Sequence, residues 1–339
     1  MSTGENQRTA SPVIRRPADG RPCAISGIGA YRPGKVVGSG ELGDRLGLAP
    51  GWIEQRTGIA SRHVADAGDS LVGMGATAAR RALAAAGVDA SDLDCVVLAT
   101  MTNVRQIPAL APALARELGA GGAGAYDVNA ACAGFSMGLA SAMGHIASGS
   151  ATHVVVVAAE RMVDVIDPGD RDTAVIFADG AGAAVVSAAD EPGLGPVAWG
   201  SDGTGEELFV LAPAPSSGEP AHRCVRMDGP ELARWFGANM APIARRALSL
   251  ADLTWDEISA FVPHQANDRL TKRFVGELDV PGHVTVARSI RTDANTSAAS
   301  IPLAVDDLLS SGRVRSGDLA LFLGFGVGIT WAAQVVRLP

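Results

Sequence analysis

Cys132 is the side chain in this sequence whose surroundings best suit a nucleophile. It lies in the run Asp127-Val-Asn-Ala-Ala-Cys132-Ala-Gly-Phe-Ser136, between an apolar strand-like stretch and a helical stretch of small residues. The N-terminus of a helix carries partial positive charge and free backbone N–H groups, which lower the pKa of a thiol and stabilise its thiolate. Cys132 is therefore predicted to accept an acyl group, and the competing interpretation is a small buried hydrophobic residue.

His264 and Asn295 are the next candidates for chemistry. His264 follows an apolar strand in Phe261-Val-Pro-His264-Gln-Ala-Asn267, where Pro263 ends the strand, so the imidazole lies at a strand-to-helix corner. A neutral imidazole can give or take a proton near physiological pH. Asn295 lies in a polar turn, Arg291-Thr-Asp-Ala-Asn295-Thr-Ser, that leads into a helix of small residues. Its amide is a candidate donor to a developing enolate or oxyanion, and its simpler interpretation is a helix N-cap.

The glycine-rich segment Gly324-Phe-Gly-Val-Gly328 follows a predicted strand, Leu319–Leu323. A turn of this composition offers backbone N–H groups to an oxyanion or a thioester carbonyl. A dinucleotide-binding loop requires the pattern GxGxxG before a helix, but the residues after Gly328 have the pattern of a strand. The segment therefore indicates oxyanion stabilisation rather than nucleotide binding.

The order Cys132, His264, Asn295 along the chain fits two chemistries. One is a cysteine hydrolase of the papain type, whose Cys, His and Asn occur in that order. The sequence around Cys132 lacks the C-G-[SA]-C-[WY] signature of that class, and the layered α/β pattern of the chain is wrong for it. The other is acyl transfer from a thioester, followed by formation of a carbon–carbon bond.

Strands and helices are predicted to alternate in two similar halves, which is typical of a layered α/β fold with internal duplication. Uniformly apolar runs predict strands buried on both faces. The predicted strands are Cys95–Thr100, Ala125–Val128, His153–Ala159, Ala181–Ser187, Ile258–Val262, Leu319–Leu323 and Ile329–Val336. The predicted helices are Pro108–Leu118, Cys132–Ser148, Pro230–Leu250, Asn267–Leu278 and Pro302–Ser310.

The 339 residues can bury a large core, since 47% are hydrophobic and only 19% are charged. A turn-rich stretch at Ala188–Gly195 predicts the seam between an N-terminal half, residues 21–190, and a C-terminal half, residues 191–339. Residues 1–20 lack the apolar segment of a signal peptide, and with their arginines and other polar residues they are predicted to be a flexible tail. No apolar run approaches the ~20 residues of a membrane span.

The composition also bears on partners and compartment. The formal net charge of −8 argues against a nucleic-acid surface. The four cysteines, Cys23, Cys95, Cys132 and Cys224, form no CxxC pair, so neither a zinc site nor a disulfide framework is predicted. Scattered cysteines without a disulfide pattern fit a reducing compartment, and we expect the protein to be cytoplasmic.

Taken together, the motifs resemble those of the β-ketoacyl synthase III family of the thiolase superfamily. The resemblance runs from about Ala24 to Leu338 and rests on four motifs in family order. These are Asn129-Ala-Ala-Cys132-Ala-Gly-Phe135, Val262-Pro-His264-Gln-Ala-Asn267, Asn295-Thr-Ser-Ala-Ala-Ser300 and Gly324-Phe-Gly326. It implies a five-layered αβαβα fold made of two duplicated halves, and a homodimer.

The resemblance also implies a mechanism. Cys132 would take an acyl group from acyl-CoA, and malonyl-acyl carrier protein would then enter. His264 and Asn295 would bind its thioester carbonyl and stabilise the enolate left by loss of CO2, and this carbanion would attack the acyl-cysteine. The N–H groups of Cys132 and Val327 would form the oxyanion hole, and no permanently bound cofactor is implied.

Further positions resemble the family's substrate-binding residues. Trp52 and Arg171 resemble the pair that holds the adenine of CoA, and Arg56 would approach its phosphates. Ile107 and Phe325 would line the acyl pocket. Ile107 stands where many members carry phenylalanine, which hints at a starter group other than acetyl. The basic residues Arg269, Lys272 and Arg273 are expected to dock the acidic carrier protein.

Two further positions depart from the family pattern. Ala294 and Val327 stand where glycine is common. Alternatives on the same fold are an acyltransferase and a non-decarboxylating condensing enzyme, and the presence of Asn295 favours decarboxylation. A catalytically silent partner subunit is a further class, which the intact set of Cys132, His264 and Asn295 argues against.

Overall fold

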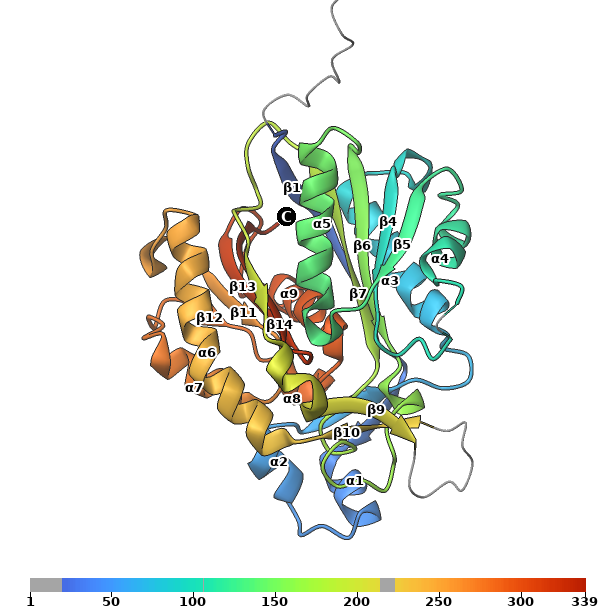
Figure 1. Ribbon diagram of the computed structural model, residues 1–339, viewed down its shortest axis with the longest axis vertical. Coiled ribbons are helices and arrows are strands. Elements are labelled where there is room, and N and C mark those ends of the chain that lie inside the picture. The colour runs from blue at the N-terminus through green and yellow to red at the C-terminus, as the bar shows by residue number, and fades with distance from the viewer. Residues whose placement is uncertain (1–19, 106, 214–222) are drawn as a thin grey trace, which may run out of the picture.

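The computed structural model describes residues 20–105, 107–213 and 223–339 (Figure 1). The predicted tail, residues 1–20, lies outside this part of the chain except for Gly20. Two five-stranded sheets dominate the fold, and their strands come from residues 23–188 and 198–337.

The first sheet is mixed and almost wholly buried. In spatial order its strands are β1 (Cys23–Tyr31), β7 (Gly180–Ala188), β6 (His153–Glu160), β4 (Cys95–Ala99) and β5 (Gly124–Val128). β4 runs parallel to β5 and β6, whereas β7 is antiparallel to β1 and β6. The uninterrupted apolar runs of β4 and β6 are buried on both faces, as the sequence predicts.

The second sheet repeats this plan in the C-terminal part of the chain. Its strands, in spatial order, are β12 (Thr285–Val286), β11 (Ala260–Pro263), β13 (Leu319–Gly326), β14 (Thr330–Arg337) and β8 (Ala198–Ser201). Two small hairpins flank the sheets: β2 (Lys35–Gly38) with β3 (Ser61–Val64), and β9 (Phe209–Pro213) with β10 (Arg223–Met227).

The helices complete five layers, α-β-α-β-α, and confirm the predicted fold class (Figure 1). Helices α5 (Gly134–Ala147) and α9 (Ser300–Ser310) lie between the two sheets. Helices α3 (Leu71–Ala86) and α4 (Ala111–Leu118) cover the first sheet, and α6 (Gly229–Leu250) and α7 (Asp268–Glu277) cover the second. Short helices α1 (Ser39–Arg45), α2 (Trp52–Thr57) and α8 (Ile290–Asp293) lie near the end of the molecule that carries the β9–β10 hairpin.

Two predicted boundaries near the candidate site are wrong. The helix predicted to begin at Cys132 begins at Gly134, and a 3₁₀ turn, Ala131–Ala133, precedes it. The strand predicted to end at Leu323 continues to Gly326, paired with β14. A Cβ on Gly324 would lie 2.4 Å from Ser136 Oγ, and one on Gly326 would lie 2.8 Å from the backbone N of Cys132. These glycines therefore serve close packing of β13 on the start of α5 rather than a turn.

Candidate active site

Cys132 lies in the 3₁₀ turn between β5 and α5, near the middle of the molecule. Its side chain is 7% exposed. Ala131, just before it, has φ 44°, a left-handed conformation that few residues other than glycine adopt and that is characteristic of functional loops. β13 packs on this turn, and Thr330 Oγ1 donates a hydrogen bond to the carbonyl of Ala130 at 3.3 Å. The C-terminal sheet therefore holds the turn that carries the thiol.

The protonation state of Cys132 differs from the sequence prediction. Burial raises the pKa of its thiol to about 12, while a hydrogen bond with Ser297 acts in the opposite direction. The nearby carboxyl of Glu160 raises the pKa further. The predicted net lowering by the helix N-terminus is wrong, because Cys132 is buried and burial disfavours the charged thiolate more strongly than its neighbours favour it. At rest, Cys132 is a neutral thiol.

His264 lies directly after β11, at the predicted corner. The backbone N–H of His264 donates to the carbonyl of Leu323 on β13, which fixes the residue beside that strand. Its Nδ1 is 2.6 Å from Ser300 Oγ, at the start of α9, and its ring packs edge-on against Phe325 at 5.0 Å. Burial lowers the pKa of His264 to about 3, so the imidazole is neutral throughout the physiological range.

Asn295 lies in the loop between α8 and α9, and its backbone forms a bridge to Phe177. Its backbone N–H donates to the carbonyl of Ile176 at 3.0 Å, and its own carbonyl accepts from Ala178 at 3.0 Å. Its side-chain oxygen Oδ1 accepts a hydrogen bond from the backbone N–H of Ser297 at 2.9 Å. This hydrogen bond sets the orientation of the side-chain amide. Oδ1 accepts within the loop, and the two N–H groups of Nδ2 can donate to another acceptor.

The Asn295 loop is held in a conformation that is unfavourable for its residues. Ala294 has φ 53° and ψ −159°, and Ser297 has φ 51°. The first of these explains why glycine is common at position 294 in the family that the sequence resembles. The Cβ of Ala294 packs in a small apolar cluster with Ile59, Ala178 and Ile290.

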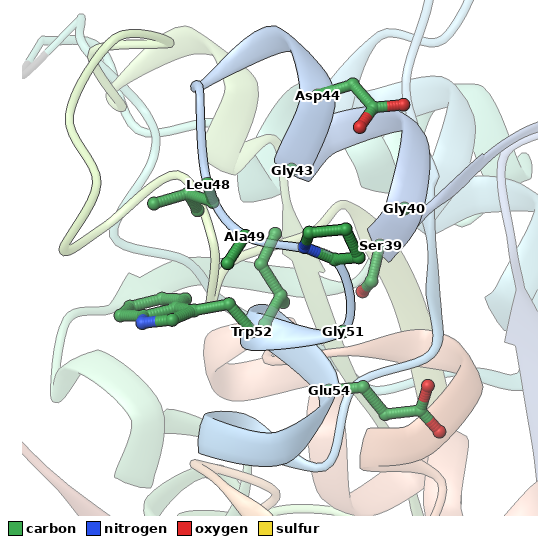
Figure 2. A pocket seen from close by; sticks show the side chains of 11 residues that line it. Ser39, Gly40, Gly43, Asp44, Leu48, Ala49, Gly51, Trp52 and Glu54 are labelled. Atoms are coloured by element: carbon green, nitrogen blue, oxygen red, sulfur yellow. The ribbon is translucent and has the colours of Figure 1, made fainter.

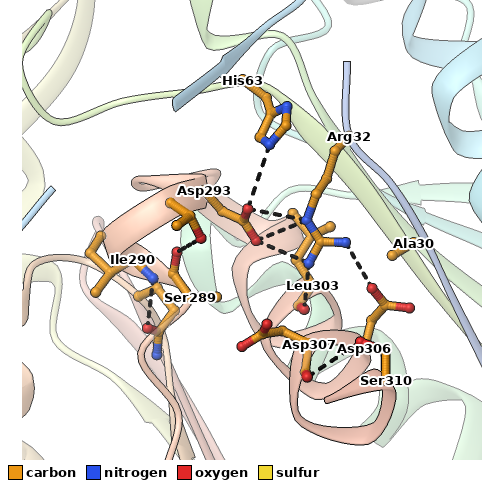
Figure 3. A network of polar contacts seen from close by, with 12 residues as sticks. Ala30, Arg32, His63, Ser289, Ile290, Asp293, Leu303, Asp306, Asp307 and Ser310 are labelled. Atoms are coloured by element: carbon orange, nitrogen blue, oxygen red, sulfur yellow. Dashed lines mark hydrogen bonds and ion pairs between the residues drawn. The ribbon is translucent and has the colours of Figure 1, made fainter. Parts of the chain in front are cut away.

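An ion-pair network secures the residue at the start of this loop (Figure 3). Arg32, which follows β1, pairs with Asp293 at 3.0 Å and with Asp306 on α9 at 2.7 Å, and it donates to the carbonyl of Leu303 at 3.0 Å. Asp293 is 6% exposed at its side chain. The N-terminal part of the chain thus anchors the loop that carries Asn295.

The structure brings the three predicted catalytic residues together around the segment from Asn295 to Ser300. The 3₁₀ turn Ser297–Ala299 packs on the turn that carries Cys132, Asn295 Oδ1 accepts from the backbone N–H of Ser297, and His264 is bonded to Ser300. Sequence reasoning missed Ser297 and Ser300 as contributors, although both belong to the motif that carries Asn295. It also missed Glu160, whose signal is a carboxyl at the end of the otherwise apolar strand β6.

The residues predicted to line the acyl pocket lie in different environments. Phe325 is 1% exposed and packs against His264, Phe236 and Phe274. Ile107 is 85% exposed on the surface of the chain. Val327 follows β13 and is partly buried.

Trp52 and Arg56 lie together on α2. The Arg56 guanidinium lies 5.3 Å from the centre of the Trp52 ring, a cation–π arrangement. Arg171 reaches the loop between α1 and α2, where one of its nitrogens would lie 3.5 Å from a Cβ on Gly47. Trp52 also lines a pocket of about 340 Å³ between α1 and α2, and its ring extends away from the carboxylates of Asp44 and Glu54 (Figure 2).

The predicted basic cluster lies on α7, but its charges are partly compensated. Lys272 pairs with Asp268 at 2.8 Å, and Arg273 pairs with Glu277 at 2.6 Å. Arg269 donates to the backbone carbonyl of Gln55 at 3.2 Å, so α7 is linked to α2. All three basic side chains remain at the surface.

Within the described ranges, no group of three or more His, Cys, Asp or Glu residues is arranged to hold a metal ion. In the same part of the chain, no helix is both long enough and apolar enough to cross a membrane.

The fold and the site define a condensing enzyme of the thiolase fold, and comparison with known proteins gives the family. Residues 126–203 match the family model for 3-oxoacyl-(acyl-carrier-protein) synthase III, and residues 248–338 match the model for its C-terminal part. The chain belongs to the β-ketoacyl-acyl carrier protein synthase III family.

Full-length relatives support the same assignment. The chain is 46% identical to beta-ketoacyl-(acyl-carrier-protein) synthase III of Streptomyces lividans, with 97% of this chain and 98% of the relative covered. It is 41% identical to the mycobacterial synthase III of Mycobacterium bovis, over 94% of this chain and 96% of the relative. Among solved structures, it is similar to the priming β-ketosynthase from the R1128 polyketide biosynthetic pathway. That match has a TM-score of 0.93 and 44% identity, and it covers 97% of this chain and 99% of the other.

Proposed function

We propose that this enzyme transfers an acyl group from acyl-CoA to Cys132 and condenses it decarboxylatively with malonyl-acyl carrier protein, which begins a fatty-acid or polyketide chain. The observation that carries this proposal is the orientation of Asn295, whose Oδ1 is engaged by Ser297 so that Nδ2 is free to donate. A plain acyltransferase has no enolate to stabilise and needs no such donor.

In the first half-reaction, the sulfur of Cys132 attacks the thioester carbonyl of acyl-CoA. The new carbon–sulfur bond replaces the bond to CoA, which leaves as its thiol. The resting pair is a neutral thiol and a neutral imidazole, so the proton leaves Cys132 during the attack rather than before it, and it ends on the sulfur of the departing CoA. We assign the oxyanion hole to the backbone N–H groups of Cys132 and Val327.

In the second half-reaction, two neutral donors hold the thioester carbonyl of the malonyl group. Ser300 Oγ accepts from the backbone N–H of Gln265 and is 2.6 Å from Nδ1 of His264, so its hydroxyl can donate to Nδ1. That arrangement places the imidazole proton on Nε2, where it joins Nδ2 of Asn295 as a donor. Loss of CO2 then gives an enolate stabilised by both, and its carbon attacks the acyl-cysteine and displaces the thiolate of Cys132, which takes up one proton from water to return to the thiol.

Substrate delivery follows from the surface residues. Arg56 covers one face of the Trp52 ring, so we assign the opposite face to the adenine of CoA, with Arg171 nearby and Arg56 toward the phosphates. The basic cluster on α7 is the proposed dock for the acidic carrier protein. The hydrogen bond from Arg269 to α2 supports a dock that lies next to the proposed CoA site.

A homodimer would complete the site. β5 is an edge strand of the first sheet, and the exposed apolar side chains Val104 and Ile107 lie on the segment that precedes α4. We propose that a second copy covers this region and that Ile107 enters the partner's acyl pocket, opposite Phe325. The four thiols of the chain are buried and unpaired, which is compatible with the cytoplasm proposed as the compartment.

Asn295→Ala tests whether Asn295 acts in decarboxylation and not in acylation of Cys132. We expect this variant to form acyl-Cys132 at close to the wild-type rate but to release CO2 from malonyl-acyl carrier protein at least 100-fold more slowly, as for loss of one oxyanion donor. Equal loss of both steps would contradict the assignment. Acylation of Cys132 with no release of CO2 from malonyl-acyl carrier protein by the wild-type enzyme would favour the alternative of an acyltransferase on the same fold.

A further inference from the structure

Arg62, on β3, is a buried cation without a role in the proposed mechanism. It is 3% exposed, and its Nε is buried with no hydrogen-bond partner. Within residues 20–105, 107–213 and 223–339, no carboxylate forms an ion pair with it. Burial lowers its pKa to about 10, so the guanidinium remains charged at neutral pH. Because a buried charge without a counter-charge lowers stability, its hydrogen bonds are the guide to what it does.

Three hydrogen bonds join Arg62 to one short segment, residues 174–178. Its Nη1 donates to the carbonyl of Ala174 at 2.8 Å and to that of Phe177 at 3.3 Å. Its Nη2 donates to the carbonyl of Val175 at 3.0 Å. The segment consists of turns and a single bridge, so the planar fork of the guanidinium supplies donors that a helix or a sheet would otherwise supply.

The same segment binds the backbone of Asn295. The N–H of Asn295 donates to the carbonyl of Ile176, and the carbonyl of Asn295 accepts from the N–H of Ala178, both at 3.0 Å. The peptide group between Phe177 and Ala178 therefore accepts from Arg62 and donates to Asn295. A single peptide group separates the guanidinium from the backbone of the asparagine.

The Asn295 loop needs support on both sides, because its backbone is strained. Ala294 has φ 53° and ψ −159°, a conformation that costs free energy and persists only where the surroundings enforce it. Before this residue, Arg32 holds Asp293 at 3.0 Å. After it, the 174–178 segment holds Asn295. Without the second support, the loop can relax toward an unstrained backbone and take Nδ2 of Asn295 away from the thioester carbonyl.

We propose that Arg62 is a positioning residue for decarboxylation, which fixes the 174–178 segment and through it the place of Asn295. Arg62 acts through Asn295 and does not itself contact the reacting atoms. This inference rests on the proposed function and extends it to a residue on β3. Arg62→Lys is the informative variant, since lysine keeps the charge but a compact ammonium cannot reproduce the fork that reaches three carbonyls.

The test compares two rates in Arg62→Lys and wild type. Acylation of Cys132 is followed by intact-protein mass at saturating acyl-CoA, because Arg171 lies three residues before the segment and a weaker CoA site must not slow this step. Release of CO2 is followed at saturating malonyl-acyl carrier protein. We expect CO2 release to be about tenfold slower in Arg62→Lys, as for a small displacement of a group that binds the reacting centre, and acylation to stay within about twofold of wild type.

A double-mutant cycle separates positioning from a general loss of structure. If Arg62 acts through Asn295, adding Arg62→Lys to Asn295→Ala should slow the residual CO2 release by less than about twofold. Arg337→Lys is the control for loss of a guanidinium that binds a backbone carbonyl. Arg337 Nη1 donates to the carbonyl of Gly317 at 3.0 Å, at the end of β14, and this variant should keep both rates of wild type.

Several results would overturn the proposal. These are equal slowing of both steps in Arg62→Lys, rates equal to those of Arg337→Lys, and a tenfold loss that persists in full in Asn295→Ala. Wild-type enzyme that releases no CO2 would overturn the proposed function as well, whereas normal CO2 release by both wild type and Arg62→Lys would overturn this inference alone.

Hydrogen exchange of the wild-type protein decides if Arg62→Lys fails to fold. The amides of Ala178 and Asn295, read at single residues, should exchange about as slowly as those of the buried strand β6. Exchange on the order of 100-fold faster than in β6 would show that the segment opens independently of its surroundings, which contradicts a fixed support for Asn295.

Discussion

Gly326→Ala is the substitution that most sharply tests how β13 positions the nucleophile. A Cβ at this position would lie 2.8 Å from the backbone N of Cys132 and 2.9 Å from the carbonyl of Ala130 and the backbone N of Ala133. Ordinary contact begins at 3.4 Å, so the two backbones must separate by about 0.6 Å. All three contacts are main-chain atoms, which cannot turn aside as a flexible side chain can.

Two quantities should change in Gly326→Ala. Overpacking should lower the free energy of unfolding by about 1–3 kcal/mol. Since a displacement of about 1 Å at a reacting group can cost on the order of 100-fold in rate, a displacement of 0.6 Å should slow acylation of Cys132 about tenfold or more. The assay is the rate of acyl transfer from acyl-CoA, followed by intact-protein mass, together with denaturant unfolding.

Gly276→Ala is the matched control for this experiment. Gly276 is exposed on α7, has no atom within 4 Å of an added Cβ, and does not have positive φ. Alanine there should raise stability by about 0.5–1 kcal/mol and leave acylation unchanged. If Gly326→Ala acylates Cys132 at the rate of Gly276→Ala, the turn is not positioned by this contact and the reasoning is refuted.

The remaining predictions concern pH, CoA and the carrier protein. Burial keeps the pKa of His264 at about 3 in the folded protein against 6.5 as its ordinary value, so the unfolded chain binds the extra proton between these values and stability falls as pH falls. The free energy of unfolding, measured with denaturant, should fall between pH 7 and pH 5 in both proteins. The fall should be about 2 kcal/mol smaller in His264→Asn than in wild type. An equal fall in both would show that His264 is not neutral in the folded state. Trp52→Ala should raise KM for acyl-CoA about tenfold without changing KM for malonyl-acyl carrier protein, and equal changes in both would remove Trp52 from the CoA site. Arg269→Glu should raise KM for malonyl-acyl carrier protein without changing KM for acyl-CoA, and the increase should be larger at low salt than at high salt. An increase that does not depend on salt would argue against an electrostatic dock.

Much of the fold follows from patterns that one sequence contains. The apolar runs that became β4 and β6 predict buried strands because few other elements tolerate uninterrupted Val and Ala of that length. The boundaries near the site are different, since they depend on contacts between distant segments. Gly324 and Gly326 have the composition of a turn, and only the approach of α5 explains why glycine is needed inside a strand.

In the candidate site too, local sequence patterns predict some features, and others depend on contacts between distant segments. The motifs identify Cys132, His264 and Asn295, because each lies at the junction of a predicted strand or turn with a helix. The ionisation of Cys132 could not be predicted, because a helix N-terminus lowers a thiol pKa whereas burial raises it, and the depth of burial is a property of the packed molecule. The hydrogen bond between Ser297 and Glu160 joins residues 137 apart in the sequence, so local patterns do not predict it.

The most direct test of the account is stepwise mass measurement of the protein itself. Wild-type enzyme and Cys132→Ser are incubated with a panel of acyl-CoAs, and malonyl-acyl carrier protein is then added. The account predicts a mass increase of one acyl group in wild type alone, followed by its loss as a β-ketoacyl product on the carrier protein when the malonyl substrate arrives. Equal labelling of Cys132→Ser, or an acyl-enzyme that persists after malonyl-acyl carrier protein is added, would contradict it.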